Sequence, residues 1–285
     1  MPSIGPYSIH AIEAGRFGLD GGAMFGIVPK PLWASRIAPD AENRIPLHTR
    51  CLLLQSDEHT VLVDTGIGDL FDGTKYADLY AIDDTAPTLL ESLAAHDVTP
   101  GDVTDVILTH LHFDHCGGAT RRDGEQRVPT FPNATYHVQT AHWDWATTSN
   151  PKERGSFLQE TFLPLDTNGH LHMVDGEGPL LPSLRVTCVN GHTESQQVVI
   201  VADDTHTLAY VADLLPTSHH LAPAWTMAYD VRPLVTIEEK ADFLRQAADA
   251  GWTLFFEHDP DIVTARAEYI DGRVQVTNPS EHLTL

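Results

Sequence analysis

The sequence is poor in cysteine, and its few cysteines form no recognisable pattern. Only three occur among 285 residues, at Cys51, Cys116 and Cys188. An odd and widely spaced set makes a poor disulfide framework, and no CxxC pair is present to supply thiolate ligands for zinc. Any metal site in this chain must therefore be built from histidine and carboxylate side chains.

Long hydrophobic runs are also missing. No stretch approaches the ~18 apolar residues that a membrane-spanning helix needs. Residues 1–6 lack the basic and then apolar pattern of a signal peptide, so we expect a cytoplasmic protein. No Pro/Gly/Ser-rich linker divides the chain. This predicts a single domain over residues 1–285, in which residues 1–50 are a lead-in segment that carries a pocket or dimer loop.

Positive charge is the third scarce feature. The chain has 17 basic against 40 acidic residues, a formal net charge of −23. That field repels nucleic acid and anionic membrane surfaces, so we expect neither as a partner. Only 4 of the basic residues are lysine, whereas 26 of the acidic ones are aspartate. A salt-tolerant source and a general acidic bias of the proteome both explain this composition.

Short apolar runs that end in polar residues alternate with amphipathic segments. Thr236 and Glu239 fit a capping box that would open a helix ending by Gly251. Strands interleaved with helices predict an α/β (α+β) fold, with a site along one edge of the sheets. Leu89, Leu90, Leu93 and Ala94 give one apolar face of a helix that Pro100 closes. Strands are expected at 51–54, 60–63, 106–109, 184–189, 197–201, 207–211 and 253–256.

The most informative segment is residues 110–118, His-Leu-His-Phe-Asp-His-Cys-Gly-Gly, directly after an apolar strand. Its four potential ligands are His110, His112, Asp114 and His115. They cannot all be buried without partners, because each unpaired imidazole or carboxylate would cost about 1–3 kcal/mol or more. A metal ion would satisfy them together. In an extended turn the first two share one side, and the last two can turn toward a second ion.

Two ions need further ligands, and the ends of later strands offer them. His192 follows Gly191, which permits a close approach, and Asp213 follows an apolar run. His258 follows another such run. Nitrogen and oxygen donors suit zinc, so we expect two Zn²⁺, with Mn, Fe or Co as alternatives.

The HxHxDH run, the following GHT, the strand-terminal aspartate and the late histidine together resemble the metallo-β-lactamase superfamily, over about Cys51 to His258. The resemblance implies an αββα sandwich with a dinuclear metal centre, and an Asp64 that braces it. It assigns His110, His112 and His192 to one ion, Asp114, His115 and His258 to the other, and Asp213 as the bridge.

The HLHFDH run and the loop 20–30 are similar to those of quorum-quenching N-acyl homoserine lactonases and of methyl parathion hydrolase relatives. The resemblance implies a hydrolase in which a metal-bridging hydroxide attacks a lactone or ester, with Asp114 passing a proton to the leaving alkoxide. The small lactonases have a tyrosine three residues after the bridging aspartate, where this chain has Pro216. Either Tyr229 supplies that hydroxyl, or the metals alone activate the carbonyl.

Other activities stay open. Aryl phosphotriester or thioester hydrolysis is the main alternative, and a non-catalytic metal-binding sensor is a more distant one. Asp213 argues against a true β-lactamase of the best-known class, which uses cysteine there. We expect a small-molecule lactone or ester substrate and a monomer or homodimer. Side chains that could line an acyl pocket, or simply pack, are Met24, Phe25, Trp33, Trp225 and Tyr229.

Overall fold

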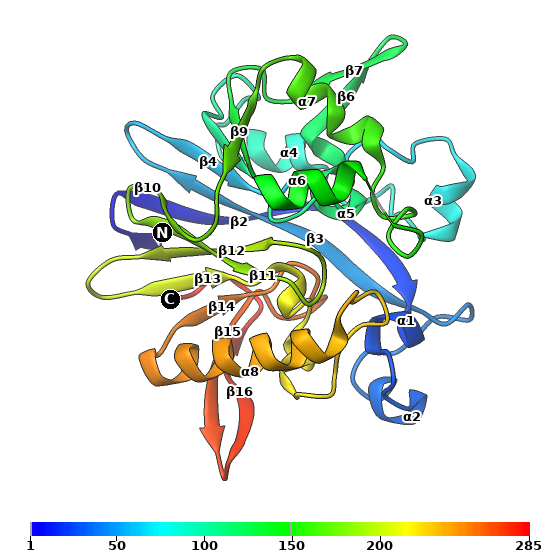
Figure 1. Cartoon of the computed structure of the whole chain (residues 1–285), viewed down its shortest axis with the longest axis vertical. Coiled ribbons are helices and arrows are strands. Elements are labelled where there is room, and N and C mark those ends of the chain that lie inside the picture. The colour runs from blue at the N-terminus through cyan, green and yellow to red at the C-terminus, as the bar shows by residue number, and fades with distance from the viewer. Residues whose placement is uncertain (1, 149) are drawn as a thin grey trace. The chain divides into compact units, whose positions relative to one another are not determined.

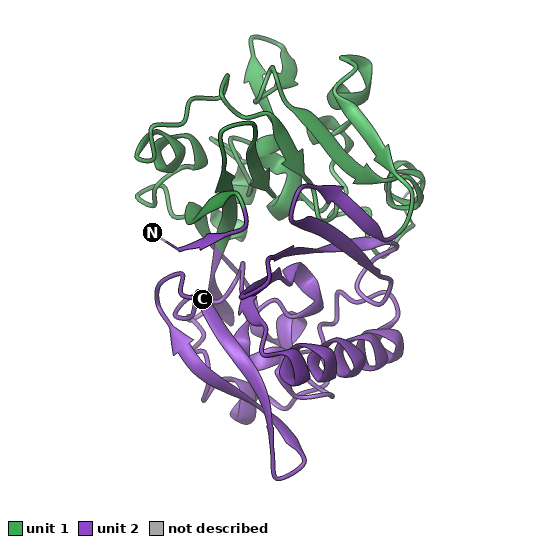
Figure 2. Cartoon of the chain, turned by 90° about the vertical axis from the view of Figure 1, so that its left-hand side faces the viewer, with its two compact units in different colours: residues 1, 6–16, 49–176 green, residues 2–5, 17–48, 177–285 purple. Residues whose placement is uncertain are grey.

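The computed structural model of the chain describes residues 2–148 and 150–285. The chain divides into two compact units, coloured separately in Figure 2, and each is described by itself. Unit 1 comprises residues 6–16 and 49–176, and unit 2 comprises residues 2–5, 17–48 and 177–285. The single domain over 1–285 stays a prediction.

The first sheet has seven strands in the order β1-β2-β3-β4-β5-β8-β9 (Figure 1). β4 pairs antiparallel with β3, whereas β5, β8 and β9 are added in parallel. Because parallel strands end at a common edge, the residues that follow β4 and β5 come together there. The strands are β1 Ser3–Ile4, β2 Tyr7–Asp20, β3 Arg44–Gln55, β4 Thr60–Val63, β5 Asp105–Ile107, β8 Thr135–Gln139 and β9 Leu171–Val174.

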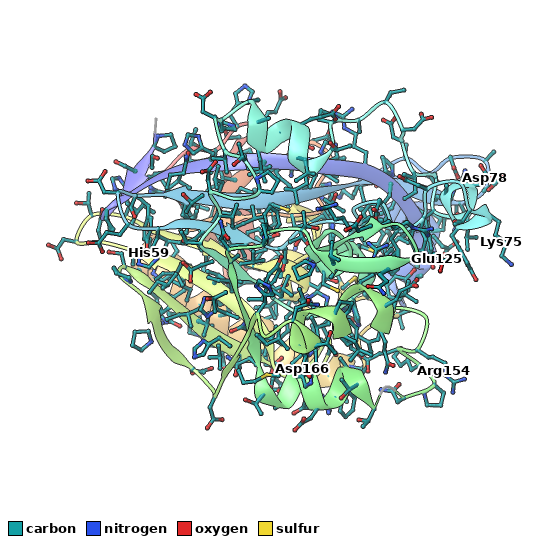
Figure 3. The ribbon with its side chains drawn as sticks, turned by 90° about the horizontal axis from the view of Figure 1, so that it is seen from above. His59, Lys75, Asp78, Glu125, Arg154 and Asp166 are labelled. Carbon is teal, nitrogen blue, oxygen red and sulfur yellow. The ribbon has the colours of Figure 1, made fainter. Side chains whose placement is uncertain are left out.

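The helices of unit 1 are short. All of them except α3, Lys75–Leu79, bury side chains in the core of the unit. In α4, a capping box formed by Thr88 and Glu91 opens the helix, and Leu89 and Leu93 join the core cluster. Charged side chains such as Lys75 and Asp166 project outward (Figure 3). The elements are α3 Lys75–Leu79, α4 Leu89–Ala94, α5 Phe113–Cys116, α6 Thr140–Thr147, α7 Leu163–Thr167, the hairpin β6 Thr120–Asp123 and β7 Gln126–Pro129, and the 3₁₀ turns η1 Gly117–Ala119 and η2 Gln159–Thr161.

The second sheet lies in unit 2 and has seven strands in sequential order, β10 to β16. All neighbours are antiparallel except β13 and β14, which are parallel because α8 connects them. The elements are β10 Gly178–Leu181, β11 Leu184–Val189, β12 Gln196–Ala202, β13 Thr207–Tyr210, β14 Thr253–Phe255, β15 Thr264–Ile270, β16 Arg273–Ser280, and the 3₁₀ turns η3 Ala212–Leu214 and η4 Ser218–Leu221. Two such sheets with flanking helices confirm the expected α/β (α+β) class.

The long helix α8, Pro233–Ala250, lies against β15 and starts earlier than expected (Figure 1). Proline in its first turn has a φ suited to a helix start. The predicted capping box at Thr236 and Glu239 is therefore wrong, because both residues lie inside the helix. The Glu239 carboxylate instead accepts hydrogen bonds from the backbone N–H groups of Asn190 and Gly191, at 2.7 and 2.9 Å.

The lead-in segment carries more regular structure than expected. β2 alternates buried and partly exposed residues along most of its length, the period of a strand, and β3 begins within the segment at Arg44. Between them lie α1, Gly21–Phe25, and α2, Lys30–Trp33. The Asp20 side chain caps α1 by accepting from Ala23 N at 2.8 Å.

Three of the five apolar residues proposed as pocket lining, Phe25, Trp33 and Trp225, pack together in unit 2. Phe25 stacks on His220 and Trp33, with ring centroids 4.8 and 5.6 Å away, and contacts the edge of Trp225. Lys240 Nζ donates to the backbone carbonyls of His220 and Trp225, each at 2.9 Å. Burial lowers the pKa of Lys240 to about 8.

Within the described ranges, no helix is long and apolar enough to cross a membrane.

Candidate metal centre

The HxHxDH segment leaves the edge of the first sheet as an extended turn and closes into the one-turn helix α5. Its tight course depends on Gly118, where a Cβ would meet the Thr65 carbonyl oxygen at 2.3 Å. Thr65 follows β4, so glycine permits the segment to lie directly on the neighbouring strand end. Thr65 N and Thr65 Oγ1 both donate to the carbonyl of His115, at 2.8 and 2.9 Å.

The four ligands predicted in unit 1 converge. His110 Nε2 and His112 Nδ1 are 3.1 Å apart, and the ring centroids of His110 and His115 are 3.9 Å apart. Asp114 Oδ2 lies 4.0 Å from His115 Nε2. All four side chains are buried or nearly so. The four predicted ligands, which lie within six positions of the sequence, are therefore also close together in the structure.

Asp64 fixes the orientation of this set. Its carboxylate accepts from Thr109 N and Thr109 Oγ1, both at 2.7 Å, and faces His115 Nδ1 at 3.1 Å. Because the Thr109 hydroxyl donates to Asp64, its oxygen is free to accept from His110 Nδ1, 3.1 Å away. Nε2 of both His110 and His115 then remains available as a metal ligand. Asp64 has a left-handed φ of 58°, which indicates local strain at this position.

The three ligands predicted in unit 2 also converge, although they are far apart in the sequence. Asp213 lies between two imidazoles, with Oδ2 3.1 Å from His192 Nε2 and Oδ1 3.3 Å from His258 Nε2. The opposite nitrogen of each ring is engaged elsewhere. His192 Nδ1 is 3.0 Å from Asp230 Oδ1, and His258 Nδ1 donates to the carbonyl of His48 at 2.7 Å.

The position of His192 is set by α8. Gly191 packs so closely on that helix that a Cβ would meet Thr236 N at 2.3 Å. Glu239 receives the two N–H groups that precede His192, and Arg232 N donates to the Gly191 carbonyl at 2.8 Å. Several contacts thus join α8 and its N-terminal flank to the turn that carries His192, a predicted ligand.

The donor set fits divalent metal ions. A neutral imidazole has one N–H, yet both nitrogens of the buried His192 face carboxylates, Asp213 and Asp230. One N–H cannot satisfy both contacts, whereas a cation between His192 Nε2 and Asp213 satisfies each group. A cation would likewise suit His258. Its Nδ1–H donates to the His48 carbonyl, so Nε2 carries no proton and faces the Asp213 carboxylate.

Tyr229 and Pro216 have different surroundings from the ligands. Tyr229 is half-buried and directly precedes Asp230, the residue that faces His192. The Pro216 carbonyl accepts the backbone N–H of His258 at 3.2 Å, so this position supports a predicted ligand through its backbone. The role of Tyr229 stays a prediction.

Sequence reasoning assigned no role to three side chains that contact the predicted ligands or their segment. Asp230 faces His192, Glu153 Oε1 lies 3.4 Å from His112 Nε2, and His142 Nε2 accepts from Leu111 N at 2.8 Å. No sequence pattern marks the last two. The Cys116 thiol, by contrast, has its pKa raised to about 12 by burial, which leaves it protonated and unsuited to act as a nucleophile.

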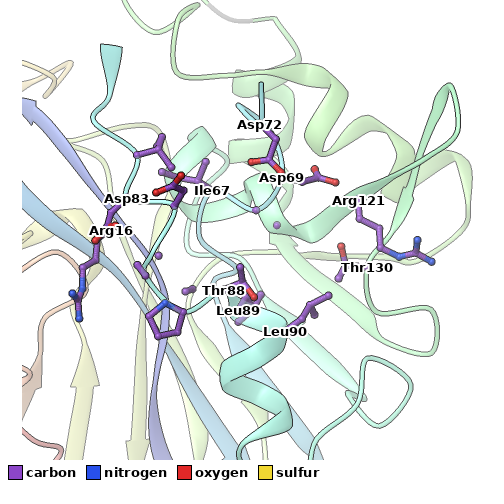
Figure 4. A pocket seen from close by; sticks show the side chains of 18 of the residues that line it. Arg16, Ile67, Asp69, Asp72, Asp83, Thr88, Leu89, Leu90, Arg121 and Thr130 are labelled. Atoms are coloured by element: carbon purple, nitrogen blue, oxygen red, sulfur yellow. The ribbon is translucent and has the colours of Figure 1, made fainter. Parts of the chain in front are cut away.

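Unit 1 also contains a cavity of about 590 Å³. Figure 4 shows Asp69, Asp72 and Asp83 on one side and Thr88 and Leu90 on the other. None of the predicted site residues in the described part of the chain lines this cavity. It is therefore separate from the candidate ligands.

Comparison with known proteins identifies the family. The profile of the Metallo-beta-lactamase superfamily matches residues 44–258, most of the chain. The chain belongs to this superfamily. A solved structure of a probable metal-dependent hydrolase from Staphylococcus aureus is 28% identical, with a TM-score of 0.87 and 100% coverage of both chains. The predicted metallo-β-lactamase fold class is thereby confirmed.

Curated relatives carry a more specific name. An N-acyl homoserine lactonase of Bacillus cereus is 28% identical over 171 residues, which cover 56% of this chain and 60% of that protein. The match to the N-acyl homoserine lactonase AttM of Rhizobium radiobacter is 25% identical and covers 60% of this chain and 64% of that one. The chain thus spans less than two thirds of these relatives.

A structure of AidC, described as a dizinc quorum-quenching lactonase in complex with a product, has a TM-score of 0.80. It is 19% identical and covers 99% of this chain and 97% of that one, so it supports the fold alone. The family and the structure from Staphylococcus aureus agree with the predicted enzyme class, a metal-dependent hydrolase.

Proposed function

We propose that this protein is a dinuclear metal-dependent hydrolase that opens lactone rings, with N-acyl homoserine lactones as the substrate class. The observation that carries the proposal is the position of Asp213, whose two oxygens face different imidazoles, His192 and His258. A carboxylate in this position suits a bridge between two cations. The naming of the relatives as N-acyl homoserine lactonases supports the substrate class.

In the proposed centre His110, His112 and His192 would hold one ion and Asp114, His115 and His258 the other, with Asp213 available to both. Two Zn²⁺ ions are the expected occupants, and when bound they supply an activated water at neutral pH and positive charge for the carbonyl oxygen. The carboxylates of Asp64 and Asp230 hold the rings of His115 and His192 in the ligating tautomer.

Ring opening adds water to the lactone carbonyl carbon and breaks the bond between that carbon and the ring oxygen. The departing alkoxide must take up a proton, and we assign its delivery to Asp114. Tyr229 is the proposed donor to the carbonyl oxygen, since Pro216 replaces the tyrosine of the small lactonases. The product is the open hydroxy acid.

The test uses Asp114→Asn with metal content measured on the same sample. If the variant retains both ions, it should lose far more lactone turnover than aryl phosphotriester turnover, because a phenolate leaves without a proton. Wild-type protein with two ions and no activity on short- or long-chain acyl homoserine lactones would refute the proposal. Phosphotriesters and thioesters in the same assay test the alternative activities.

A further inference from the structure

Glu153 is a carboxylate outside every recognised motif, yet it lies beside a proposed ligand. Its side chain is 2% exposed, and Oε1 is the carboxylate oxygen that lies beside His112 Nε2, at 3.4 Å. This is longer than the usual range of about 2.7–3.2 Å for an N–H···O hydrogen bond, and the buried Nε2 makes no hydrogen bond among the residues that the structure describes. The other oxygen, Oε2, accepts from Trp145 Nε1 at 2.8 Å and from Asn150 Nδ2 at 2.6 Å. One oxygen is therefore anchored, and the other faces the imidazole.

The surrounding loop holds this carboxylate in place. Glu153 N donates to Asn150 Oδ1 at 3.2 Å, and the Glu153 carbonyl accepts from Ser156 N at 2.8 Å. The Ser156 carbonyl in turn accepts from Phe113 N at 3.0 Å, one residue beyond His112. The loop is thus joined to the HxHxDH segment through its backbone as well as through Glu153.

The ring of His112 has a defined direction. Nδ1 is the atom that faces His110 Nε2, at 3.1 Å, so Nδ1 is the candidate ligand atom. A neutral imidazole binds a metal through Nδ1 only when its proton is on Nε2. The atom beside Glu153 is the one that must carry this proton.

We propose that Glu153 is a positioning residue of the metal centre, which accepts the Nε2 proton of His112 and so fixes the tautomer and orientation in which Nδ1 binds. The inference rests on the proposed function, because it presupposes that His112 is a ligand. It extends to His112 the arrangement by which Asp64 faces His115 and Asp230 faces His192. Glu153 thereby makes the 150–157 loop a part of the metal-binding apparatus.

The variant Glu153→Gln tests the role with little change in size. Glutamine has one oxygen, and Trp145 Nε1 and Asn150 Nδ2 both require an acceptor. If the oxygen stays with them, the amide NH₂ faces His112 Nε2 and favours the tautomer with the proton on Nδ1. We expect metal affinity, measured by chelator competition, to fall about 10–100-fold. In zinc-loaded protein, NMR should show that the His112 Nε2–H exchanges with water faster in the variant than in the wild type.

The matched control is Asp105→Asn. Asp105 is a buried carboxylate of the same unit that faces His59 and His137, at 3.0 and 2.8 Å, and neither histidine is a proposed ligand. This variant should lower the melting temperature and leave metal affinity unchanged. A loss of metal affinity that simply followed stability would appear in both variants, whereas a positioning role appears in Glu153→Gln alone.

Wild-type-like metal affinity in folded Glu153→Gln would overturn the inference and leave the lactonase proposal intact. If the variant does not fold, the zinc-loaded wild type decides, because NMR must show that the His112 Nε2–H is protected from exchange with water. Rapid exchange of this proton overturns the role of Glu153. A wild-type protein that binds no metal overturns both proposals.

Discussion

The two units contribute proposed ligands in opposite ways. Unit 1 supplies His110, His112, Asp114 and His115 from one short segment that leaves a parallel strand. Unit 2 supplies three ligands from separate strand ends, and α8 and its neighbouring loops position them. A local motif fixes the geometry of the first set, whereas the second set depends on the whole topology of its sheet.

This difference predicts where substitutions act most strongly. In unit 1 the ligands share a backbone, so a change in one carboxylate that braces them affects several at once. In unit 2 each ligand has its own support, and Asp213 is the group that His192 and His258 both face. Removing that shared group should therefore have the largest effect.

The largest expected effect is that of Asp213→Ala. Loss of both oxygens that face His192 and His258 should release at least one metal ion and reduce lactone turnover more than about 100-fold, since losing even an outer partner costs ~10–100-fold. Metal analysis and steady-state kinetics on one preparation would check this. Asp204→Ala, an exposed aspartate of the same unit, is the control. Full activity with one ion per chain would contradict the dinuclear centre.

A second substitution pair compares the supports directly. Asp64 faces three donor atoms, whereas Asp230 faces His192 Nδ1. Asp64→Asn should lower metal affinity about 100-fold, and Asp230→Asn nearer to 10-fold. Asparagine tolerates the left-handed backbone at position 64, so the loss reports the carboxylate. Chelator competition measures both, and equal losses would remove the distinction between the two units.

The contrast between one ligand segment in unit 1 and separate strand ends in unit 2 also explains which site residues the sequence could predict. The HxHxDH run predicts four ligands because its residues adjoin one another. Asp213 and His258 are predicted as ligands from strand ends, since apolar runs before a polar residue are visible in sequence. Glu153 was missed because it lies in a loop without periodicity, and its contact with His112 is made only by the folded chain.

Two elements of the fold were misassigned for physical reasons. Thr236 and Glu239 have the spacing of a capping box, but Pro233 already starts α8, and Glu239 accepts from Asn190 N and Gly191 N. The β2 residues lie in the predicted lead-in segment, for which no strand is predicted. In the structure these residues alternate between buried and partly exposed positions, and the sequence already has apolar residues two positions apart, at Tyr7 and Ile9. This period of two would have predicted the strand.

Glycine substitutions test how closely each ligand segment packs. A Cβ at Gly118 or at Gly191 would lie 2.3 Å from a backbone atom, the Thr65 oxygen or the Thr236 nitrogen. Alanine at either position should lower the free energy of unfolding by about 1–3 kcal/mol. Gly155→Ala, where nothing lies within 4 Å, should change it by less than about 0.5 kcal/mol. Urea denaturation measures all three, and a neutral Gly191→Ala would show that α8 does not constrain His192.

Salt should have the smallest effect, a shift in the melting temperature. This prediction concerns a property that the two units share, their excess of acidic residues. Acidic residues outnumber basic ones by more than two to one in each unit, within a formal net charge of −23. Self-repulsion of this kind is screened over about 10 Å at 0.1 M salt, so the melting temperature should rise by a few degrees as KCl goes from tens of millimolar to molar. Calorimetry across that series measures the shift. Because both units carry the excess, any separate transitions should move together. A flat or falling curve would exclude adaptation to salt and leave the acidic bias as a matter of composition.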